Sequence, residues 1–331
     1  MSALGFWREL PRPIRALAPM EDVTDTVFRR IVASVAPPDV YFTEFVNADG
    51  LCSRGHDAVA HRLRFTETER PIVAQIWGNT PENYVKAARM IRALGFDGID
   101  INMGCPVKKI VKNGACSALI ENPALASELF HAACEGAGGL PVSIKTRLGF
   151  RTTKTEEWGR FLLELCPAVL TMHGRTARDM SDVPANWNEV AKVCAIRDEI
   201  GAETLVLGNG DVVSKTDLDS FPGRYGVDGV MVARGIFKDL NMFRRGPTDE
   251  ESFANRHRAE KVELYLRHVA LYRATWGDGR NFNIMKKFAK VYISGFPGAA
   301  TLRGELMETS NYDQMMQILE GTHHVEAQSA T

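Results

Sequence analysis

The chain has no large excess of charge of either sign. Its 331 residues include 40 Lys and Arg against 41 Asp and Glu, which gives a formal net charge of −1. A basic surplus over the whole chain, which would suggest a nucleic-acid or membrane-surface partner, is therefore missing. This balance does not exclude a local basic patch.

Long apolar segments and paired cysteines are scarce as well. Arg8, Glu9, Arg12 and Arg15 interrupt the N-terminal region, so it lacks the apolar stretch of a secretion signal, and no run is apolar enough to cross a bilayer. The six cysteines are scattered and form no CxxC pair. We therefore expect a cytoplasmic protein with no membrane segment, mostly reduced cysteines and no metal site.

Short apolar runs that end in polar or glycine-bearing clusters are the dominant pattern of this chain. There are eight, at 15–20, 40–45, 71–78, 98–104, 141–149, 168–176, 204–211 and 229–235, and stretches with helical character separate most of them. An apolar strand that is followed by a polar or glycine-bearing cluster, repeated eight times between helical stretches, predicts a (β/α)₈ TIM barrel. Such barrels keep their active sites at the carboxyl ends of the strands.

The chain is longer than a barrel needs, because such a barrel typically takes about 250 residues. From 246 onward no strand-like run remains, and the segments 251–276, 281–294, 299–307 and 312–319 indicate helices. We predict a catalytic barrel over 1–245 and a helical domain over 246–331, with a turn-rich join at 246–249 and a frayed end from 321. In the barrel we expect helices over 27–35, 81–94 (N-cap Thr80), 123–136 and 187–200.

Strand alternation predicts which side chains face into the barrel. Residues 143, 145 and 147 share one face, residues 171, 173 and 175 share another, and Asp100 and Asn102 point away from the apolar residues between them. Polar side chains inside a closed barrel cost free energy unless they meet a polar ligand. The pattern therefore favours a cofactor bound at the mouth.

Two clusters predict a phosphate site, because the loops after the seventh and eighth strands commonly hold a phosphate in this fold. Small residues let backbone N–H groups approach phosphate oxygens, and an arginine adds a charged contact. The predicted ligands are Asn209, Gly210, Asp211, Ala233 and Arg234. Taken alone, the glycines and Asn209 would fit an ordinary turn.

Three inward residues admit two interpretations each. Lys145 either reaches out at the barrel rim or places a cation beside a flavin, where negative charge develops on reduction. His173 is either a structural histidine or a ligand of the same cofactor. Gln75 either hydrogen-bonds a ring carbonyl or holds a loop.

The segment 102–106 is the sharpest local feature. Gly104 and Pro106 constrain the backbone on both sides of Cys105, which could act as a nucleophile or a proton donor, or be a buried turn residue. Cys116 is the rival thiol. It lies in the small-residue stretch 113–118, which suits close packing better.

At several of these places the sequence resembles the tRNA-dihydrouridine synthase family. The shared motifs include Ala18-Pro19-Met20-Glu21-Asp22, Thr43-Glu44-Phe45, Asn102-Met103-Gly104-Cys105-Pro106, Ser143-Ile144-Lys145-Thr146-Arg147, His173-Gly174-Arg175-Thr176 and Asn209-Gly210-Asp211. The match runs in order from about residue 15 to 235, and a weaker one covers parts of 285–303. Two departures are Cys116 and Ala233, where the family more usually has small residues and glycine.

The resemblance implies a flavoprotein that binds FMN, takes electrons from NADPH and reduces uridine in tRNA to 5,6-dihydrouridine. It assigns Cys105 as the catalytic acid and Asn102 to positioning of the base. It assigns to the flavin Pro19, Met20, Glu21, Gln75, Lys145 and His173, with the phosphate on the five residues named above. For tRNA we expect Arg175 and the lysines that follow the cysteine, Lys108, Lys109 and Lys112. We expect a monomer.

Two other functions stay open at this point. An FMN-dependent barrel reductase acting on a small molecule would share the phosphate site and Lys145, but would not need the helical domain. A catalytically silent RNA-binding protein would retain no flavin, and the presence of both Cys105 and Lys145 argues against it.

Overall fold

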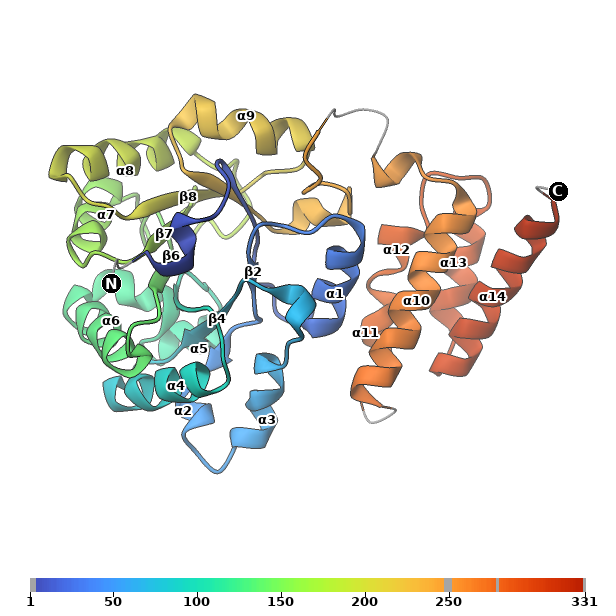
Figure 1. Ribbon diagram of the computed structural model, residues 1–331, viewed down its shortest axis with the longest axis horizontal. Coiled ribbons are helices and arrows are strands. Elements are labelled where there is room, and N and C mark those ends of the chain that lie inside the picture. Colours follow the sequence, from blue (N-terminus) through green and yellow to red (C-terminus); the bar gives the residue numbers. More distant parts are fainter. Residues whose placement is uncertain (1–3, 247–251, 278–279, 330–331) are drawn as a thin grey trace. The chain divides into compact units, whose positions relative to one another are not determined.

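The computed structural model describes residues 4–246, 252–277 and 280–329 (Figure 1). The chain divides into two compact units. The barrel unit comprises the chain up to Thr26 and Pro38–Gly235, and the helical unit comprises Val27–Pro37 and the chain from Ile236 onward. We predicted the change at 246, and most of that predicted join, 247–249, lies outside the described residues.

Parallel strands form a closed barrel, which confirms the predicted TIM barrel. They are β1 (Ile14–Leu17), β2 (Tyr41–Phe42), β3 (Val46–Asn47), β4 (Ile72–Trp77), β5 (Gly98–Met103), β6 (Val142–Arg147), β7 (Val169–His173), β8 (Leu205–Asn209) and β9 (Gly229–Val232). Their order is β1-β9-β8-β7-β6-β5-β4-β2, and a parallel bridge from Ala16 to Val40 joins the last strand to the first. The carboxyl ends of all strands therefore meet at one mouth.

The second apolar run does not form the single strand expected over 40–45. Only β2 lies within the run, β3 begins just after it at Val46, and both short strands pair with β4. Between them the Thr43 hydroxyl accepts a hydrogen bond from the Gln75 N–H at 3.1 Å, where a ladder carbonyl would normally accept it. A side-chain oxygen thus interrupts the ladder, and the predicted extent of this strand was wrong.

The helices that flank the barrel are α2 (Ala48–Leu51), α3 (His56–Ala60), α4 (Pro81–Ala93), α5 (Lys108–Lys112), α6 (Pro123–Ala137), α7 (Thr155–Glu164), α8 (Trp187–Ile200) and α9 (Lys215–Tyr225). The predicted bounds of α8 are confirmed. Thr80 stands at the N-cap of α4 as expected, but its hydroxyl makes no capping bond.

Helix α6 continues past the glycine that we expected to end it. Gly136 lies inside the helix, and Gly138 in the left-handed conformation caps it. A Cβ built at Gly136 would lie 2.3 Å from the Val85 carbonyl oxygen of α4. This glycine therefore permits the close approach of two helices.

The helical unit contains α1 (Thr26–Val35, from Val27), α10 (Arg258–Trp276), α11 (Asn283–Lys286), α12 (Ala289–Tyr292), α13 (Ala299–Glu308) and α14 (Tyr312–Ser329). Aromatic rings fill its interior. The Phe28 ring of α1 stacks on Phe288 at 5.2 Å between centroids, and Tyr265 stacks on Tyr292 at 4.9 Å. Helix α1 follows the first barrel strand in sequence, yet this packing explains why it groups with the C-terminal helices.

Three helix predictions for this unit need correction. The helix expected over 251–276 begins at Arg258, and residue 251 itself lies outside the described residues. The helix expected over 281–294 is two short helices, α11 and α12. Helix α14 continues to Ser329, although we expected the chain to fray from 321, because a single Gly321 costs only about 1 kcal/mol and no proline follows it; residues 330 and 331 lie outside the described residues. Across the part of the chain that is described, no helix is long and apolar enough to cross a membrane.

Candidate active site

Four buried side chains connect three strands to the backbone at Cys105. The Asn102 Oδ1 atom accepts hydrogen bonds from the N–H groups of Gly104 and Cys105, each at 3.0 Å. Its amide nitrogen donates to Gln75 Oε1 at 3.0 Å, and Gln75 Nε2 donates to Asp100 Oδ2 at 2.7 Å. Ser143 donates to the other Asp100 oxygen at 2.6 Å. We call these four residues the Asp100 relay.

Burial perturbs the carboxyl group in this relay. Asp100 has no exposed surface, and burial raises its pKa to about 6, although hydrogen bonds from Ser143 and Gln75 act in the opposite direction. At neutral pH Asp100 is therefore mostly a carboxylate, which can only accept hydrogen bonds.

The two cysteines considered as candidate acids are neighbours in the structure. The N–H of Ser117 donates to the Cys105 carbonyl at 3.3 Å, so the segment that carries Cys116 lies against the turn that carries Cys105. Cys105 is half-buried, whereas Cys116 is fully buried. A hydrogen bond from the Cys116 thiol lowers the pKa of Cys105 to about 7, against the effect of burial. Burial and the same contact raise the pKa of Cys116.

Arg147 donates hydrogen bonds to backbone carbonyls of the loops near these thiols. Its Nε donates to the Gly104 carbonyl at 2.8 Å, and one terminal nitrogen donates to the carbonyls of Thr176 and Met180 at 3.0 and 2.9 Å. Burial lowers the pKa of Arg147 to about 10, so the side chain remains a cation at neutral pH. The loops after β5 and β7 are thus held by one side chain from β6.

Lys145 of β6 connects to a residue of β8 at the mouth. Its Nζ donates to Asn209 Oδ1 at 3.1 Å, and the amide of Asn209 donates to the Met231 carbonyl at 2.7 Å. Burial, followed by the nearby Arg147 cation, lowers the pKa of Lys145 to about 8. The ammonium group therefore keeps its charge at neutral pH while lying in surroundings that favour its loss.

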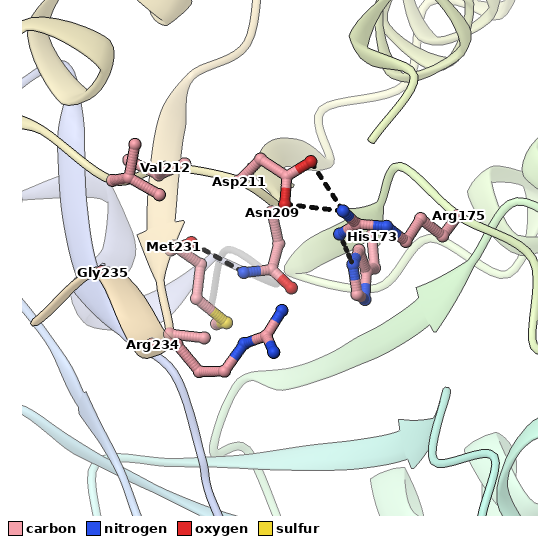
Figure 2. Close-up of a pocket in the computed structure, with 11 residues that line it drawn as sticks. His173, Arg175, Asn209, Asp211, Val212, Met231, Arg234 and Gly235 are labelled. Carbon is pink, nitrogen blue, oxygen red and sulfur yellow. Dashed lines mark hydrogen bonds and ion pairs between the residues drawn. The ribbon is translucent and has the colours of Figure 1, made fainter. Parts of the chain in front are cut away.

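A cavity of about 80 Å³ lies at the ends of β7, β8 and β9 (Figure 2). The predicted phosphate ligands Asn209, Gly210, Asp211, Ala233 and Arg234 all line it, together with His173 and Arg175. Gly210 is needed here for two reasons: its φ is +117°, and a Cβ would lie 2.8 Å from the Ala185 Cβ and 3.0 Å from the His173 ring. The cavity suits a phosphate-sized group rather than a ring system.

Only part of the charge in this cavity is available to a ligand. Both Asp211 oxygens accept from Arg175 at 2.6 Å, and Arg175 also donates to the Val183 carbonyl and to His173 Nε2 at 2.5 and 3.2 Å. Burial would raise the pKa of Asp211, but the Arg175 contact keeps it below its ordinary value. Burial and several cations lower the pKa of His173, so its ring is neutral.

Arg234 is the cation left for an anion. Its side chain is exposed, and among the described residues no hydrogen bond or ion pair engages its guanidinium, which points toward Asn209 in Figure 2. Arg175, by contrast, is 4% exposed and its nitrogens are occupied. The geometry therefore leaves the Arg234 guanidinium accessible to a ligand, whereas Arg175 holds the loops together.

Next to this cavity around the mouth lie the residues that follow β1 and β2, because β1 pairs with β9. Pro19 and Met20 are partly exposed, and the exposed Glu21 forms an ion pair with Arg62. Glu44 is buried, and burial with the nearby Asp25 and Glu21 raises its pKa to about 7. Predicted flavin residues thus occur here as well as at the phosphate cavity.

Helix α5 begins directly after the Cys105-Pro106 turn. Lys108, Lys109 and Lys112 are all exposed, and no described acidic side chain forms an ion pair with them. Three cations beside the mouth suit a polyanion.

Residue types alone did not reveal every member of the site. Asp100 and Ser143 were expected only to face inward, where Asp100 was one of the polar side chains that favoured a bound cofactor, and Arg147 was only part of a motif. Their function as supports becomes visible from the bonds they make across strands. Gln75 was predicted to contact the flavin and Asn102 to contact the substrate. Most hydrogen-bonding groups of both side chains are already engaged within the relay.

Fold and site together define a TIM-barrel protein whose mouth combines a thiol, a buried amine and an anion-sized cavity. The family model described as "Dihydrouridine synthase (Dus)" matches residues 16–329. The chain is 43% identical over 321 residues to a "Probable tRNA-dihydrouridine synthase 2" of Bacillus subtilis (strain 168), covering 96% of each chain. The chain belongs to the dihydrouridine synthase family.

Other comparisons agree with this result. A "Probable tRNA-dihydrouridine synthase" of Staphylococcus aureus (strain COL) is 41% identical over 319 residues, covering 96% of this chain and 95% of the relative. Among solved structures, a 2-naphthoyl-CoA reductase complex matches with a TM-score of 0.55 at 9% identity, over 70% of this chain and 49% of that one. A morphinone reductase mutant in complex with tetrahydroNAD matches with a TM-score of 0.50 at 14% identity, over 73% and 87%. These structures bear on the fold alone.

Proposed function

We propose that this protein is a tRNA-dihydrouridine synthase, which reduces uridine in tRNA to 5,6-dihydrouridine. One observation carries the proposal: the family match covers the barrel and the helical unit, and Cys105 of the shared motif is held at the barrel mouth. The names of the relatives in Bacillus and Staphylococcus support the same substrate.

FMN is the cofactor that the residues at the mouth fit. The cavity of about 80 Å³ would take its phosphate against Arg234 and the loops at Gly210 and Ala233. Lys145 and His173 would lie toward the ring system, together with Pro19, Met20 and Glu21, which follow β1. When bound, FMN supplies the hydride, and we infer that NADPH replenishes it.

Cys105 would then provide the proton. Reduction of the uracil double bond adds a hydride at C6 and a proton at C5, so the ring needs an acid on the face opposite the hydride donor. The half-buried thiol, with its backbone held by Asn102, is such an acid. Lys145 keeps a positive charge in the mouth, where it stabilises negative charge that develops during the transfer.

The exposed lysines of α5 would hold tRNA phosphates. A uridine in a folded RNA must leave its stack to reach a barrel mouth. Contacts to the backbone on each side of the extruded base position it without reading its sequence. Lys108, Lys109 and Lys112 suit this task because they are exposed, form no ion pair with the acidic side chains that the structure describes, and follow Cys105 closely in the chain.

The test is reduction of a tRNA that lacks dihydrouridine. The purified protein would be incubated with FMN, NADPH and either that tRNA or free uridine at equal uridine concentration, and dihydrouridine would be measured by mass spectrometry. We expect product with tRNA and far slower turnover with free uridine. Equal rates would support a small-molecule reductase instead, and no product with either substrate would contradict the proposal.

A further inference from the structure

We propose that Asp100 and Ser143 are positioning residues for the proton donor: through Gln75 and Asn102 they set the orientation of the backbone that carries Cys105. This inference rests on the proposed function for its kinetic consequences. Its geometric basis is the Asp100 relay, in which each of four side chains from β4, β5 and β6 bonds the next.

The relay has a single direction, which begins at the backbone. The N–H groups of Gly104 and Cys105 can only donate, so the Asn102 side chain must present its oxygen to them. The Asn102 side-chain nitrogen then faces Gln75, so Gln75 must accept this hydrogen bond through its side-chain oxygen. The Gln75 nitrogen consequently faces position 100, where only an acceptor fits. A carboxylate there accepts from Gln75 and from Ser143 at once.

Burial makes this direction costly to violate. Gln75, Asp100 and Ser143 have no exposed surface, and Asn102 is 6% exposed. Water cannot replace a lost partner at such sites, so a mismatched contact keeps its full penalty. Arg147 and the Ser117 N–H hold the carbonyls of Gly104 and Cys105, and the relay holds the N–H groups of the same two residues. The turn is therefore fixed from both sides.

Asn102→Asp tests the direction with an almost isosteric change. The new carboxylate still accepts from the two N–H groups, but its second oxygen faces the Gln75 oxygen. If Gln75 rotates, its oxygen faces Asp100 instead, so one contact between two acceptors remains in either case. We expect hydride transfer to tRNA to slow by about ten- to hundredfold, in kcat rather than in KM for tRNA.

The double variant Asn102→Asp/Asp100→Asn restores every contact with the direction reversed. With Gln75 rotated, its nitrogen donates to the carboxylate at 102, the amide at 100 donates to the Gln75 oxygen, and Ser143 donates to the remaining amide oxygen. We expect recovery of about tenfold or more over Asn102→Asp. Both variants carry a carboxylate at position 102, so its charge beside Cys105 is common to them.

Asp100→Asn and Asp100→Leu complete the set. The Asn variant keeps an acceptor for Gln75 if the Ser143 hydroxyl turns to accept, and that hydroxyl can then donate to the Ile99 carbonyl 3.3 Å away. We expect this variant to lose several-fold less rate than Asp100→Leu, which leaves the Gln75 nitrogen without an acceptor. Such rescue by the conservative variant would not follow if position 100 served packing alone.

The experiment measures single-turnover oxidation of the reduced flavin by tRNA in the absence of oxygen, for all four variants. The alkylation rate of Cys105, followed by peptide mass mapping, and the melting temperature are measured in parallel. Recovery of rate and of Cys105 alkylation in the double variant would support the relay. A double variant as slow as Asn102→Asp, with flavin content and melting temperature intact, would overturn it and leave Asn102 as a direct contact of the base.

The two proposals fail in different ways. If the unmodified protein reduces no tRNA uridine, the proposed function is wrong, but the alkylation rates still report the orientation of Cys105. If it does reduce tRNA and neither rate recovers in the double variant, the relay alone is refuted.

Discussion

At the scale of single residues, Cys105 is defined by its neighbours more than by its own chemistry. A thiol ordinarily loses its proton above neutral pH, and burial alone would raise its pKa further. The Cys116 thiol donates a hydrogen bond that instead lowers the pKa of Cys105 to about 7. Cys116, at a position whose small neighbours suit close packing, thus also lowers the pKa of Cys105.

Removal of the Cys105 thiol should stop proton donation without emptying the site. A positioned general acid contributes about 10²–10⁴-fold in rate. We expect Cys105→Ala to lose that factor in reduced-flavin oxidation by tRNA, while still binding FMN, accepting electrons from NADPH and binding tRNA. Cys134→Ala, an exposed cysteine on α6, is the matched control. A Cys105→Ala variant with the unmodified rate would mean that another group donates the proton.

The pH profile should report the Cys105 thiol. Only the protonated form can donate, so the rate of hydride transfer to tRNA should fall as pH rises through about 7. Cys116→Ala removes the hydrogen bond that stabilises the thiolate, which raises the pKa of Cys105 and moves this fall to higher pH. Single-turnover rates measured from about pH 6 to about pH 9 would show the shift in the pH at which the rate falls. Identical profiles for the two proteins would rule out this role for Cys116.

At the scale of elements, α5 carries its three lysines as one exposed group directly after the Cys105-Pro106 turn. Replacement of Lys108, Lys109 and Lys112 by Ala should weaken tRNA binding and reduce its salt dependence. The slope of log K against log salt should fall by about 0.7–0.9 for each lost phosphate contact. FMN content should not change. The measurement is tRNA affinity over a range of salt concentrations.

A control for α5 needs the same loss of charge elsewhere. Lys86, Arg160 and Lys192 are exposed or ion-paired residues on α4, α7 and α8. Their replacement by Ala should leave the salt slope close to that of the unmodified protein. Equal effects of the two triple variants would indicate that net charge, rather than α5, determines binding.

The contact between α4 and α6 depends on the absence of one side chain. Gly136→Ala would place a Cβ 2.3 Å from the Val85 carbonyl oxygen and 2.7 Å from the Ala88 Cβ. Overpacking of this kind typically costs about 1–3 kcal/mol. Gly223→Ala in α9 meets nothing within 4 Å and should be neutral or slightly stabilising. Denaturant unfolding of both variants would test the contrast, and equal stabilities would contradict it.

At the scale of the whole molecule, a ligand that binds only the folded barrel should stabilise it. FMN at one hundred times its dissociation constant adds about 2.7 kcal/mol. Arg234→Ala removes a charged contact and should weaken FMN binding by about ten- to hundredfold. At the same FMN concentration the stabilisation should then fall to about 1.4–0.4 kcal/mol. Unfolding with and without FMN measures it.

The control for this ligand effect is Arg89→Ala, which removes an exposed arginine on α4 that pairs with Glu135. It should respond to FMN as the unmodified protein does. If Arg234→Ala gains as much stability from FMN as this control, the cavity at the ends of β7, β8 and β9 does not hold the phosphate.

Some properties of this protein follow from the sequence by itself. The repeated apolar runs and their polar ends predicted the barrel, because a strand buried on both faces needs continuous apolar residues and the chemistry of this fold collects at one end. Alternation placed Lys145 and Asp100 inward, since successive side chains of a strand point to opposite faces. Local rules of this kind need no knowledge of distant residues.

Other properties depend on contacts between segments far apart in sequence, and only the tertiary structure decided them. Phe28 of helix α1 packs on Phe288, which lies 260 positions later in the chain. The position of α1 directly after the first strand therefore did not predict that it groups with the helical unit. The carbonyl oxygen that excludes a side chain at Gly136 belongs to Val85 of another helix. Cys116 is a neighbour of Cys105, and Asp100 supports Asn102 through Gln75, because strands and loops meet at the mouth. Local sequence patterns predict which face a side chain occupies, but the partner on that face is set by how the whole chain closes.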